Sequence, residues 1–307
     1  MLARSAPRRR RRVLPVLLAV LLIVAAYRAF TVEPRPAWAY LQDSPVILAH
    51  AGAQGHAPAN TKESFQLALQ QGADILETDV HMTKDGVLVF SHDDTIDRMS
   101  NGTGFIKSMT LQELRQFDFG YDFTPDNGQT FPYRGKGVTI PTVEEVFKNF
   151  PGTRVNLEIK QVDPPIEEAL WKLIQQYNMQ EKVLVNSFHS PAQKRWVELT
   201  GGKTAMGANR GHMYEFVAYY LPFLDRLYHP RVDAFQLPVS QNVGPFTIRF
   251  DTERLVKVAH RLNMKVHYWT INDEATMRHL LDIGADGIIT DYPDRAMKVM
   301  KDAGYRK

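Results

Sequence analysis

Short apolar runs alternate with amphipathic stretches along most of the chain from Pro45 onward. The runs are rich in Val, Ile, Leu and Phe and are bounded by turn residues, which is typical of buried β-strands. We predict strands at residues 45–49, 73–81, 87–90, 154–160, 183–187, 204–209, 234–237, 265–269 and 287–290. Helices are predicted at residues 60–72, 142–147, 166–177, 190–200, 252–262 and 273–283. Asn60 and Thr142 are the expected N-caps of the first two, each with a glutamate three residues later as capping-box partner.

A strand followed by a helix, repeated about eight times, is the pattern of an α/β protein with a parallel sheet. Spread over residues 46–307, such units fit a closed (β/α)₈ TIM barrel, and a doubly wound open sheet is the alternative. The alternation breaks at about residues 94–140, which are rich in Gly, Asp, Thr and aromatic residues. Long irregular segments inside a compact domain are usually functional, so we expect a small cap inserted after the third strand.

Polar and charged side chains stand at the C-terminal ends of several predicted strands. In a barrel these ends share one face, and active sites lie on that face. The residues concerned are His50, Glu77, Asp79, His92, Glu158, Lys160 and Trp269. Their common position makes them candidates for a single functional site.

Glu77 and Asp79 lie near the end of one predicted strand, followed by a turn at residues 84–86. Residues two apart on a strand face the same way, so the two carboxylates point in one direction. Two neighbouring anions repel each other and are costly to desolvate, and a hard cation such as Ca²⁺ or Mg²⁺ removes that cost. A solvated strand end also explains the pair in isolation, but the other polar strand ends favour a metal site.

The N-terminal part of the chain has its own charge pattern. Six arginines and no acidic residue lie in residues 1–12, which we expect to be a basic cytoplasmic tail. Uncharged residues 13–27 follow, and Arg28 interrupts an apolar stretch that reaches residue 32. We predict a transmembrane anchor at residues 13–32, with a cleaved signal peptide as the alternative. A single-pass membrane protein with its folded part on the periplasmic or extracellular side would follow.

Composition narrows the function classes further. Three prolines make residues 33–45 a predicted linker before the barrel. The net charge of +3 comes from the tail, because removing its six arginines leaves 31 basic against 34 acidic residues, or −3. The folded part is therefore not expected to bind nucleic acid. The chain has no cysteine, which excludes disulfides and thiolate metal sites.

A set of short motifs occurs in order over nearly the whole folded part. They are His50-x-Gly52, Pro58-x-Asn60-Thr61, Glu77-x-Asp79, His92-Asp93, Asn101-Gly-Thr-Gly104, Leu157-Glu-Ile-Lys160, Ser187-Phe188, Trp269-Thr-x-Asn272 and Asp286-Gly-Ile-Ile-Thr-Asp-Tyr-Pro293. With this order and spacing, the chain from about Val46 to Asp294 resembles the glycerophosphodiester phosphodiesterase family. The resemblance implies a (β/α)₈ barrel that hydrolyses glycerophosphodiesters to sn-glycerol 3-phosphate and an alcohol, using Ca²⁺ or Mg²⁺.

The resemblance also implies roles for individual residues. Glu77, Asp79 and Glu158 match the family's metal ligands. His50 and His92 match its acid–base pair, although His92 is sometimes assigned to the metal. Two histidines suit proton transfer near neutral pH.

The substrate-binding residues follow the same resemblance, with two departures. Lys160 is expected to hold the phosphate, and Trp269 to form a wall of the pocket. Ala51 stands where the family usually has an arginine that meets the phosphate, and Ala59 where it usually has a glutamate. Losing a base and an acid together keeps the local charge balanced, which indicates a retuned site and leaves the substrate's identity open.

Several alternatives remain at this stage. The protein could act as a lysophospholipase D on membrane lysolipids, as a phospholipase-C-like lyase, or as a catalytically silent binding protein. The helical stripe that contains Phe216, Tyr219, Tyr220 and Tyr228 is either a helix packed on the barrel or a lipid-facing rim. His81 lies in phase with Glu77 and is either a further metal ligand or a polar strand end.

Overall fold

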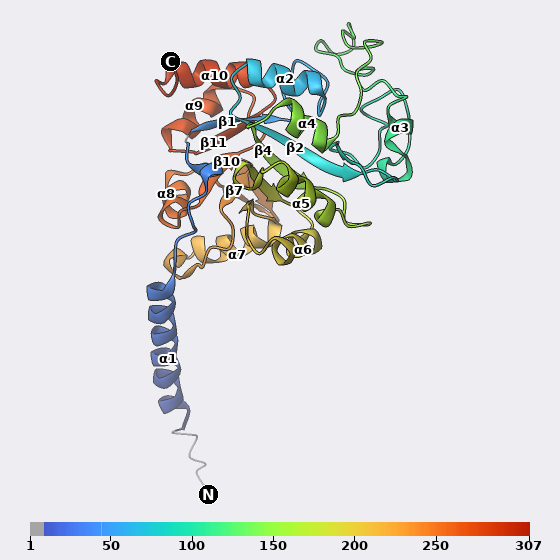
Figure 1. The fold of residues 1–307 in the computed structure, drawn as a ribbon. Coiled ribbons are helices and arrows are strands. Elements are labelled where there is room, and N and C mark those ends of the chain that lie inside the picture. The colour runs from blue at the N-terminus through green and yellow to red at the C-terminus, as the bar shows by residue number, and fades with distance from the viewer. Residues whose placement is uncertain (1–8, 44) are drawn as a thin grey trace, which may run out of the picture.

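Eight parallel strands form a nearly closed barrel in the computed structural model, which describes residues 9–43 and 45–307 (Figure 1). In order around the barrel they are β1 (Val46–His50), β2 (Ile75–Met82), β4 (Arg154–Ile159), β5 (Val183–Asn186), β6 (Ala205–Met206), β7 (Ala234–Leu237), β10 (Lys265–Tyr268) and β11 (Gly287–Thr290). Because β1 pairs with both β2 and β11, the sheet curls back on itself. Between β6 and β7 a single parallel bridge joins Gly207 to Ala234. The predicted TIM-barrel architecture is thus confirmed, and the alternative of an open, doubly wound sheet is not observed in the described residues.

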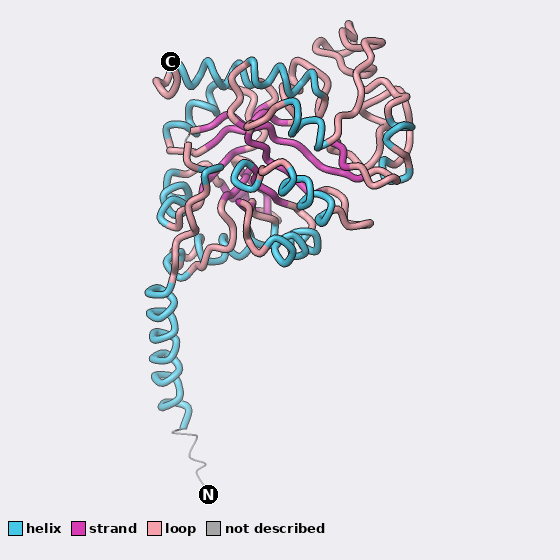
Figure 2. Tube along the Cα trace, viewed as in Figure 1, coloured by secondary structure: helices cyan, strands magenta, loops and turns pink. Residues whose placement is uncertain are grey.

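Helices surround the strands, as the cyan and magenta segments of Figure 2 show. They are α2 (Lys62–Gln70), α4 (Val143–Asn149), α5 (Glu167–Gln176), α6 (Ser190–Thr200), α7 (Arg210–Tyr220), α8 (Glu253–Arg261), α9 (Glu274–Asp282) and α10 (Pro293–Asp302). Thr142 and Glu145 form the predicted capping box of α4. At α2 the cap is Thr61 instead of the expected Asn60, whose side-chain oxygen accepts a hydrogen bond from Thr78.

The third predicted strand, β3 (Leu88–Phe90), is not part of the parallel barrel. It pairs antiparallel with the outer end of β2, where Val80 faces Phe90. The tight turn before it, in which Gly86 has a φ of +81°, sends the chain back along the strand it has just left. The expected insertion follows, with η2 (Ile106–Ser108) and the short helix α3 (Leu111–Leu114).

The insertion has its own small apolar core, made of Val89, Ile96, Ile106, Leu114, Phe119, Val138 and Ile140. In Figure 1 it lies beyond the end of the barrel towards which β2 points. The insertion therefore flanks the C-terminal face of the strands. A hairpin that the sequence did not predict, β8 (Ser240–Val243) with β9 (Phe246–Arg249), connects β7 to α8.

Residues expected to form a linker close the other end of the barrel. The short helix η1 (Ala39–Leu41) buries Tyr40 and Leu41 against Val46, Leu48 and Ile75 inside the barrel. Upstream, Arg35 forms an ion pair with Asp233 at 2.7 Å. The apolar interior of the barrel thus extends from the end closed by η1 to the polar C-terminal ends of the strands.

The structure corrects the prediction for the N-terminal region. Residues 9–31 form helix α1 (Arg9–Thr31), and residues 1–8 of the expected cytoplasmic tail lie outside the described part. Among the described residues, no helix is both long enough and apolar enough to cross a bilayer, so the predicted single-pass anchor and non-cytoplasmic location are wrong. The physical reason is that arginines limit the uncharged stretch to residues 13–27, about 22 Å of helix against a ~30 Å hydrocarbon core.

The aromatic stripe packs on the barrel, as one of its two interpretations predicted. Phe216, Tyr220 and Tyr228 are buried, and Phe216 contacts Phe235 of β7 with ring centroids 4.6 Å apart. Tyr219 lies 5.7 Å from the guanidinium of Arg28, which connects the end of α1 to this surface. The three buried rings are therefore unavailable to a lipid surface, whereas Phe223 and Leu224 of the same stretch are exposed.

Candidate active site

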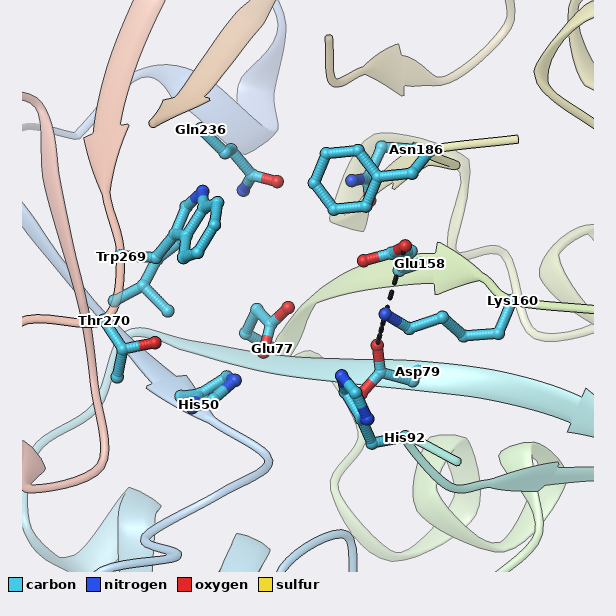
Figure 3. A pocket seen from close by; sticks show the side chains of 12 residues that line it. His50, Glu77, Asp79, His92, Glu158, Lys160, Asn186, Gln236, Trp269 and Thr270 are labelled. Carbon is cyan, nitrogen blue, oxygen red and sulfur yellow. Dashed lines mark ion pairs between the residues drawn. The ribbon is translucent and has the colours of Figure 1, made fainter. Parts of the chain in front are cut away.

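The seven residues singled out from the sequence all line one cavity of about 170 Å³ at the C-terminal ends of the strands. They are His50, Glu77, Asp79, His92, Glu158, Lys160 and Trp269. In Figure 3 their side chains surround a common space, although they come from distant parts of the chain. The strand register explains the meeting, because Glu77 lies beside His50 on β1 and Asp79 beside Glu158 on β4.

Lys160 lies between two of the carboxylates. Its Nζ is 3.1 Å from Asp79 Oδ1 and 3.2 Å from Glu158 Oε1. Burial alone would lower the pKa of the Lys160 ammonium, but these two anions outweigh burial and raise it. Burial raises the pKa of Glu158, and the lysine counteracts this only in part. The ammonium therefore balances two carboxylates with one positive charge.

Glu77 is the carboxylate that Lys160 does not contact within hydrogen-bonding distance. Its Oε2 is buried and has no hydrogen-bond partner among the described residues. Burial is the main cause that raises the pKa of Glu77, and the negative charges of Asp79 and Glu158 add to it. A buried carboxylate oxygen without a partner is costly, and a cation would satisfy it.

The donor set fits a hard divalent cation. Glu77, Asp79 and Glu158 offer only oxygen atoms, which are the ligands preferred by Ca²⁺ and Mg²⁺. In the described part of the chain, however, no three His, Asp or Glu side chains stand close enough to form a ready-made metal cluster. The ammonium of Lys160 occupies the space between two of the three acids. The metal assignment therefore remains a prediction.

A hydrogen bond to Asp291 holds the ring of His50. The His50 Nδ1 and Asp291 Oδ1 atoms are 2.7 Å apart, and Gln54 Nε2 donates to the same oxygen. Burial would lower the pKa of His50, but this hydrogen bond and the charges of Glu77, Asp291 and Asp79 outweigh burial and raise it to about 9. With Nδ1 engaged, Nε2 is the nitrogen left to face the cavity.

His92 is held in the same way by Asp93. Its Nδ1 lies 2.8 Å from Asp93 Oδ1, and Arg98 Nε donates to the other oxygen of Asp93 at 2.7 Å. Its side chain is 53% exposed against 28% for His50, so the two imidazoles have different surroundings. Carboxylates that hold the outer ring nitrogen fix both the tautomer and the orientation of a histidine.

His81 does not belong to this cavity. It pairs with Val89 of β3, on the part of β2 that extends past the barrel rim, and its side chain is buried. Burial is the main cause that lowers its pKa. Spacing along β2 suggested a ligand because it could not reveal that the strand continues beyond the site.

Five lining residues were missed by the sequence analysis. They are Asn186, Phe188, Gln236, Thr270 and Ile289. Asn186 is the register partner of Glu158 at the end of β5, so a full strand alignment could have found it. Asp291, which the sequence analysis did not assign to the site, holds the ring of His50.

The two alanine departures lie in different environments. Ala51 is buried, has a φ of +48° and donates its backbone N–H to the carbonyl oxygen of Glu77 at 2.9 Å. Ala59 lines a separate cavity of about 240 Å³ between the loop after β1 and the insertion. Only Ala59 therefore faces open space in which a longer side chain could extend.

Comparison with known proteins gives consistent matches. The model of the glycerophosphoryl diester phosphodiesterase family matches residues 50–295. A glycerophosphodiester phosphodiesterase of Caldanaerobacter subterraneus subsp. tengcongensis is 34% identical over 84% of this chain and 99% of its own length. A phosphodiesterase of Oleispira antarctica, solved with the product sn-glycerol-3-phosphate, has a TM-score of 0.67 and 28% identity over 84% of this chain and 97% of its own.

A third match concerns the fold alone. A glycerophosphoryl diester phosphodiesterase domain of Mycobacterium tuberculosis superposes with a TM-score of 0.74 at 20% identity, covering 83% of this chain and 99% of that domain. The part of the chain that the family model matches runs from His50 to Arg295, so it contains every residue that lines the catalytic cavity.

Proposed function

Because the chain belongs to the glycerophosphoryl diester phosphodiesterase family, we propose that it hydrolyses glycerophosphodiesters to sn-glycerol 3-phosphate and an alcohol, with a divalent metal ion and two histidines. The observation that carries the proposal is the meeting of three carboxylates, two imidazoles and one ammonium in a single cavity. Keeping so many charged groups together in a partly buried site is costly unless a ligand uses them. The family and this set of side chains argue against a catalytically silent binding protein.

The metal ion would be held by Glu77, Asp79 and Glu158. When bound there, Ca²⁺ or Mg²⁺ supplies positive charge that neutralises the phosphate oxygens and orients the attacking oxygen. The unpartnered Oε2 of Glu77 supports this assignment. Lys160 contributes a second positive charge next to the same carboxylates and is the proposed phosphate-binding side chain.

The two histidines divide the proton transfers. His50 carries a proton at neutral pH because its pKa is raised to about 9, so it is suited to protonate the leaving alcohol oxygen. His92, oriented through Nδ1 by Asp93, presents Nε2 to accept the proton of the attacking water. Trp269 forms the wall of the cavity opposite Lys160 in Figure 3, where it would pack against the glycerol carbons.

Substitution of either histidine tests these roles. His50→Asn and His92→Asn should each reduce kcat by about 10²- to 10⁴-fold, since general acid–base catalysis contributes that much. Metal affinity, measured by calorimetry, should stay close to that of the wild type because neither ring is a proposed ligand. Wild-type turnover in either variant would remove that histidine from the mechanism.

Product identity tests the reaction itself. The purified full-length protein is incubated with glycerophosphocholine, glycerophosphoethanolamine, glycerophosphoinositol and a lysophospholipid, and released sn-glycerol 3-phosphate is measured. We expect glycerol phosphate from the water-soluble diesters. A cyclic phosphate product would instead indicate a phospholipase-C-like lyase, and release from the lysolipid alone would indicate a lysophospholipase D.

A further inference from the structure

We propose that the cavity beside Ala59 binds the alcohol arm of the diester, and that it favours uncharged polyols over cationic alcohols such as choline. This inference rests on the proposed function. The cavity measures about 240 Å³ and lies between the loop after β1 and the insertion. Its walls include Gln54, Ala59, Arg98, Phe119, Asp122 and Thr124.

Two of these wall residues connect the cavity to the catalytic histidines. Gln54 donates to Asp291 Oδ1, the oxygen that also accepts from His50. Arg98 donates to Asp93, whose other oxygen holds His92 at 2.8 Å. Gln54 Nε2 also lies 2.5 Å from His50 Nδ1, so a molecule in this cavity would be separated from the proposed acid by Gln54 alone, and from His92 by Arg98 and Asp93.

A phosphodiester has two arms, and the catalytic cavity is too small for both. Its volume of about 170 Å³ is below the roughly 300–1,000 Å³ of pockets that enclose whole small ligands, so one arm has to extend out of it. Within the catalytic cavity, the side-chain oxygen of Asn186 and the amide nitrogen of Gln236 are buried and have no hydrogen-bond partner in the described part of the chain. These atoms and the wall formed by Trp269 suit the glycerol arm, which leaves the neighbouring cavity for the alcohol.

The charges around the second cavity decide which alcohols suit it. Arg98 is paired with Asp93 at 2.7 Å, and Asp122 lies 4.0 Å from Arg134, so each charged wall residue has an opposite charge nearby. Ala59 adds no charge to the wall. The lining residues therefore carry no surplus anion for a quaternary or primary ammonium. The side-chain carbonyl oxygen of Gln54, whose nitrogen is engaged by Asp291, offers an acceptor for the hydroxyls of a polyol such as inositol.

The test adds one charge to the wall and controls for side-chain size. We compare the wild type with Ala59→Glu and Ala59→Gln, which have nearly the same size and differ in one charge. The readout is the ratio of kcat/KM for glycerophosphoinositol to kcat/KM for glycerophosphocholine. The wild type should prefer the inositol diester, and Ala59→Glu should lower the ratio by about five- to tenfold relative to Ala59→Gln, the size expected of one unit charge near the ligand. Ala303→Glu, an exposed site at the end of α10, should leave it unchanged.

A second variant guards against local misfolding at position 59. Thr124→Glu adds a carboxylate from the insertion side of the same cavity and should shift the ratio in the same direction. If glycerol phosphate is released but the ratio is equal in all variants, or the wild type prefers the choline diester, the inference about the alcohol arm is overturned while the proposed function stands. If no diester is hydrolysed by the wild type, the proposed function fails and the inference fails with it.

Discussion

At the scale of single residues, the hydrogen bond from His50 to Asp291 determines how the proposed acid works. The carboxylate fixes the ring through Nδ1 and stabilises its protonated form. Asn272 and Gln54 donate to the same carboxylate, and burial, which would raise the pKa of Asp291, is outweighed so that its pKa is lowered. Asp291 is thus a positioning residue that acts through His50.

Asp291→Asn should therefore shift the pH profile. Because a protonated His50 is needed, kcat/KM should fall as pH rises through the pKa of His50, which is about 9 in the native protein. Removing the negative charge lowers this pKa, so the alkaline limb of the profile should move to lower pH. An alkaline limb at the same pH in the variant would show that His50 is not the acid.

A second residue-scale prediction concerns stability. His267 is buried on β10 beside its register partner Gly287, and burial lowers its pKa to about 4. The unfolded chain binds the proton at about pH 6.5, so the folding free energy that this neutral ring contributes is present above pH 6.5 and is lost as pH falls towards 4. The loss should reach about 3 kcal/mol at pH 4.

Urea unfolding at pH 7 and pH 4 measures this effect. His267→Leu lacks the titrating group, so its stability should decrease less between the two pH values than that of the wild type. Equal decreases in both proteins would show that protonation of His267 does not contribute to acid sensitivity.

At the scale of elements, the sequence predicted the parallel strands well because each is a short apolar run with polar residues at its end. The antiparallel β3 was counted with them, since its apolar run looks like a barrel strand and only pairing distinguishes the two. The hairpin of β8 and β9 was missed because both strands are short and largely exposed, which gives little alternation to detect. Helix starts were predicted where a capping residue has its partner three positions later, as at Thr142.

The cap of α4 should contribute measurably to stability. Thr142 Oγ1 accepts from the Glu145 N–H at 3.0 Å, and Glu145 Oε2 accepts from the Thr142 N–H at 2.9 Å. Thr142→Ala should lower the free energy of unfolding by about 1 kcal/mol. Thr247→Ala, at an exposed position of β9, should change it by less than about 0.5 kcal/mol. Equal decreases in the free energy of unfolding of the two variants, measured with urea, would show that the capping hydrogen bonds do not stabilise the protein.

At the scale of the whole molecule, closure of the barrel brings together residues that are far apart in the chain. The sequence identified the strand-end residues, and the register of β1, β2 and β4 explains why four of them are neighbours. It could not reveal that Lys160 lies between Asp79 and Glu158, or that Asn186 and Gln236 complete the cavity, because side-chain contacts depend on three-dimensional packing. The N-terminal prediction failed because the uncharged stretch between the arginines is too short to cross a bilayer.

The most direct test of the account is the dependence of turnover on a divalent ion bound by Glu77. The purified protein is stripped with a chelator and assayed for release of glycerol phosphate, and then Ca²⁺ or Mg²⁺ is added back, in parallel with Glu77→Gln. We predict that chelation abolishes turnover, that one of the two ions restores it in the wild type, and that neither ion restores it in the variant at the same concentration. Full turnover by the stripped wild type, or full restoration in Glu77→Gln, would contradict the account.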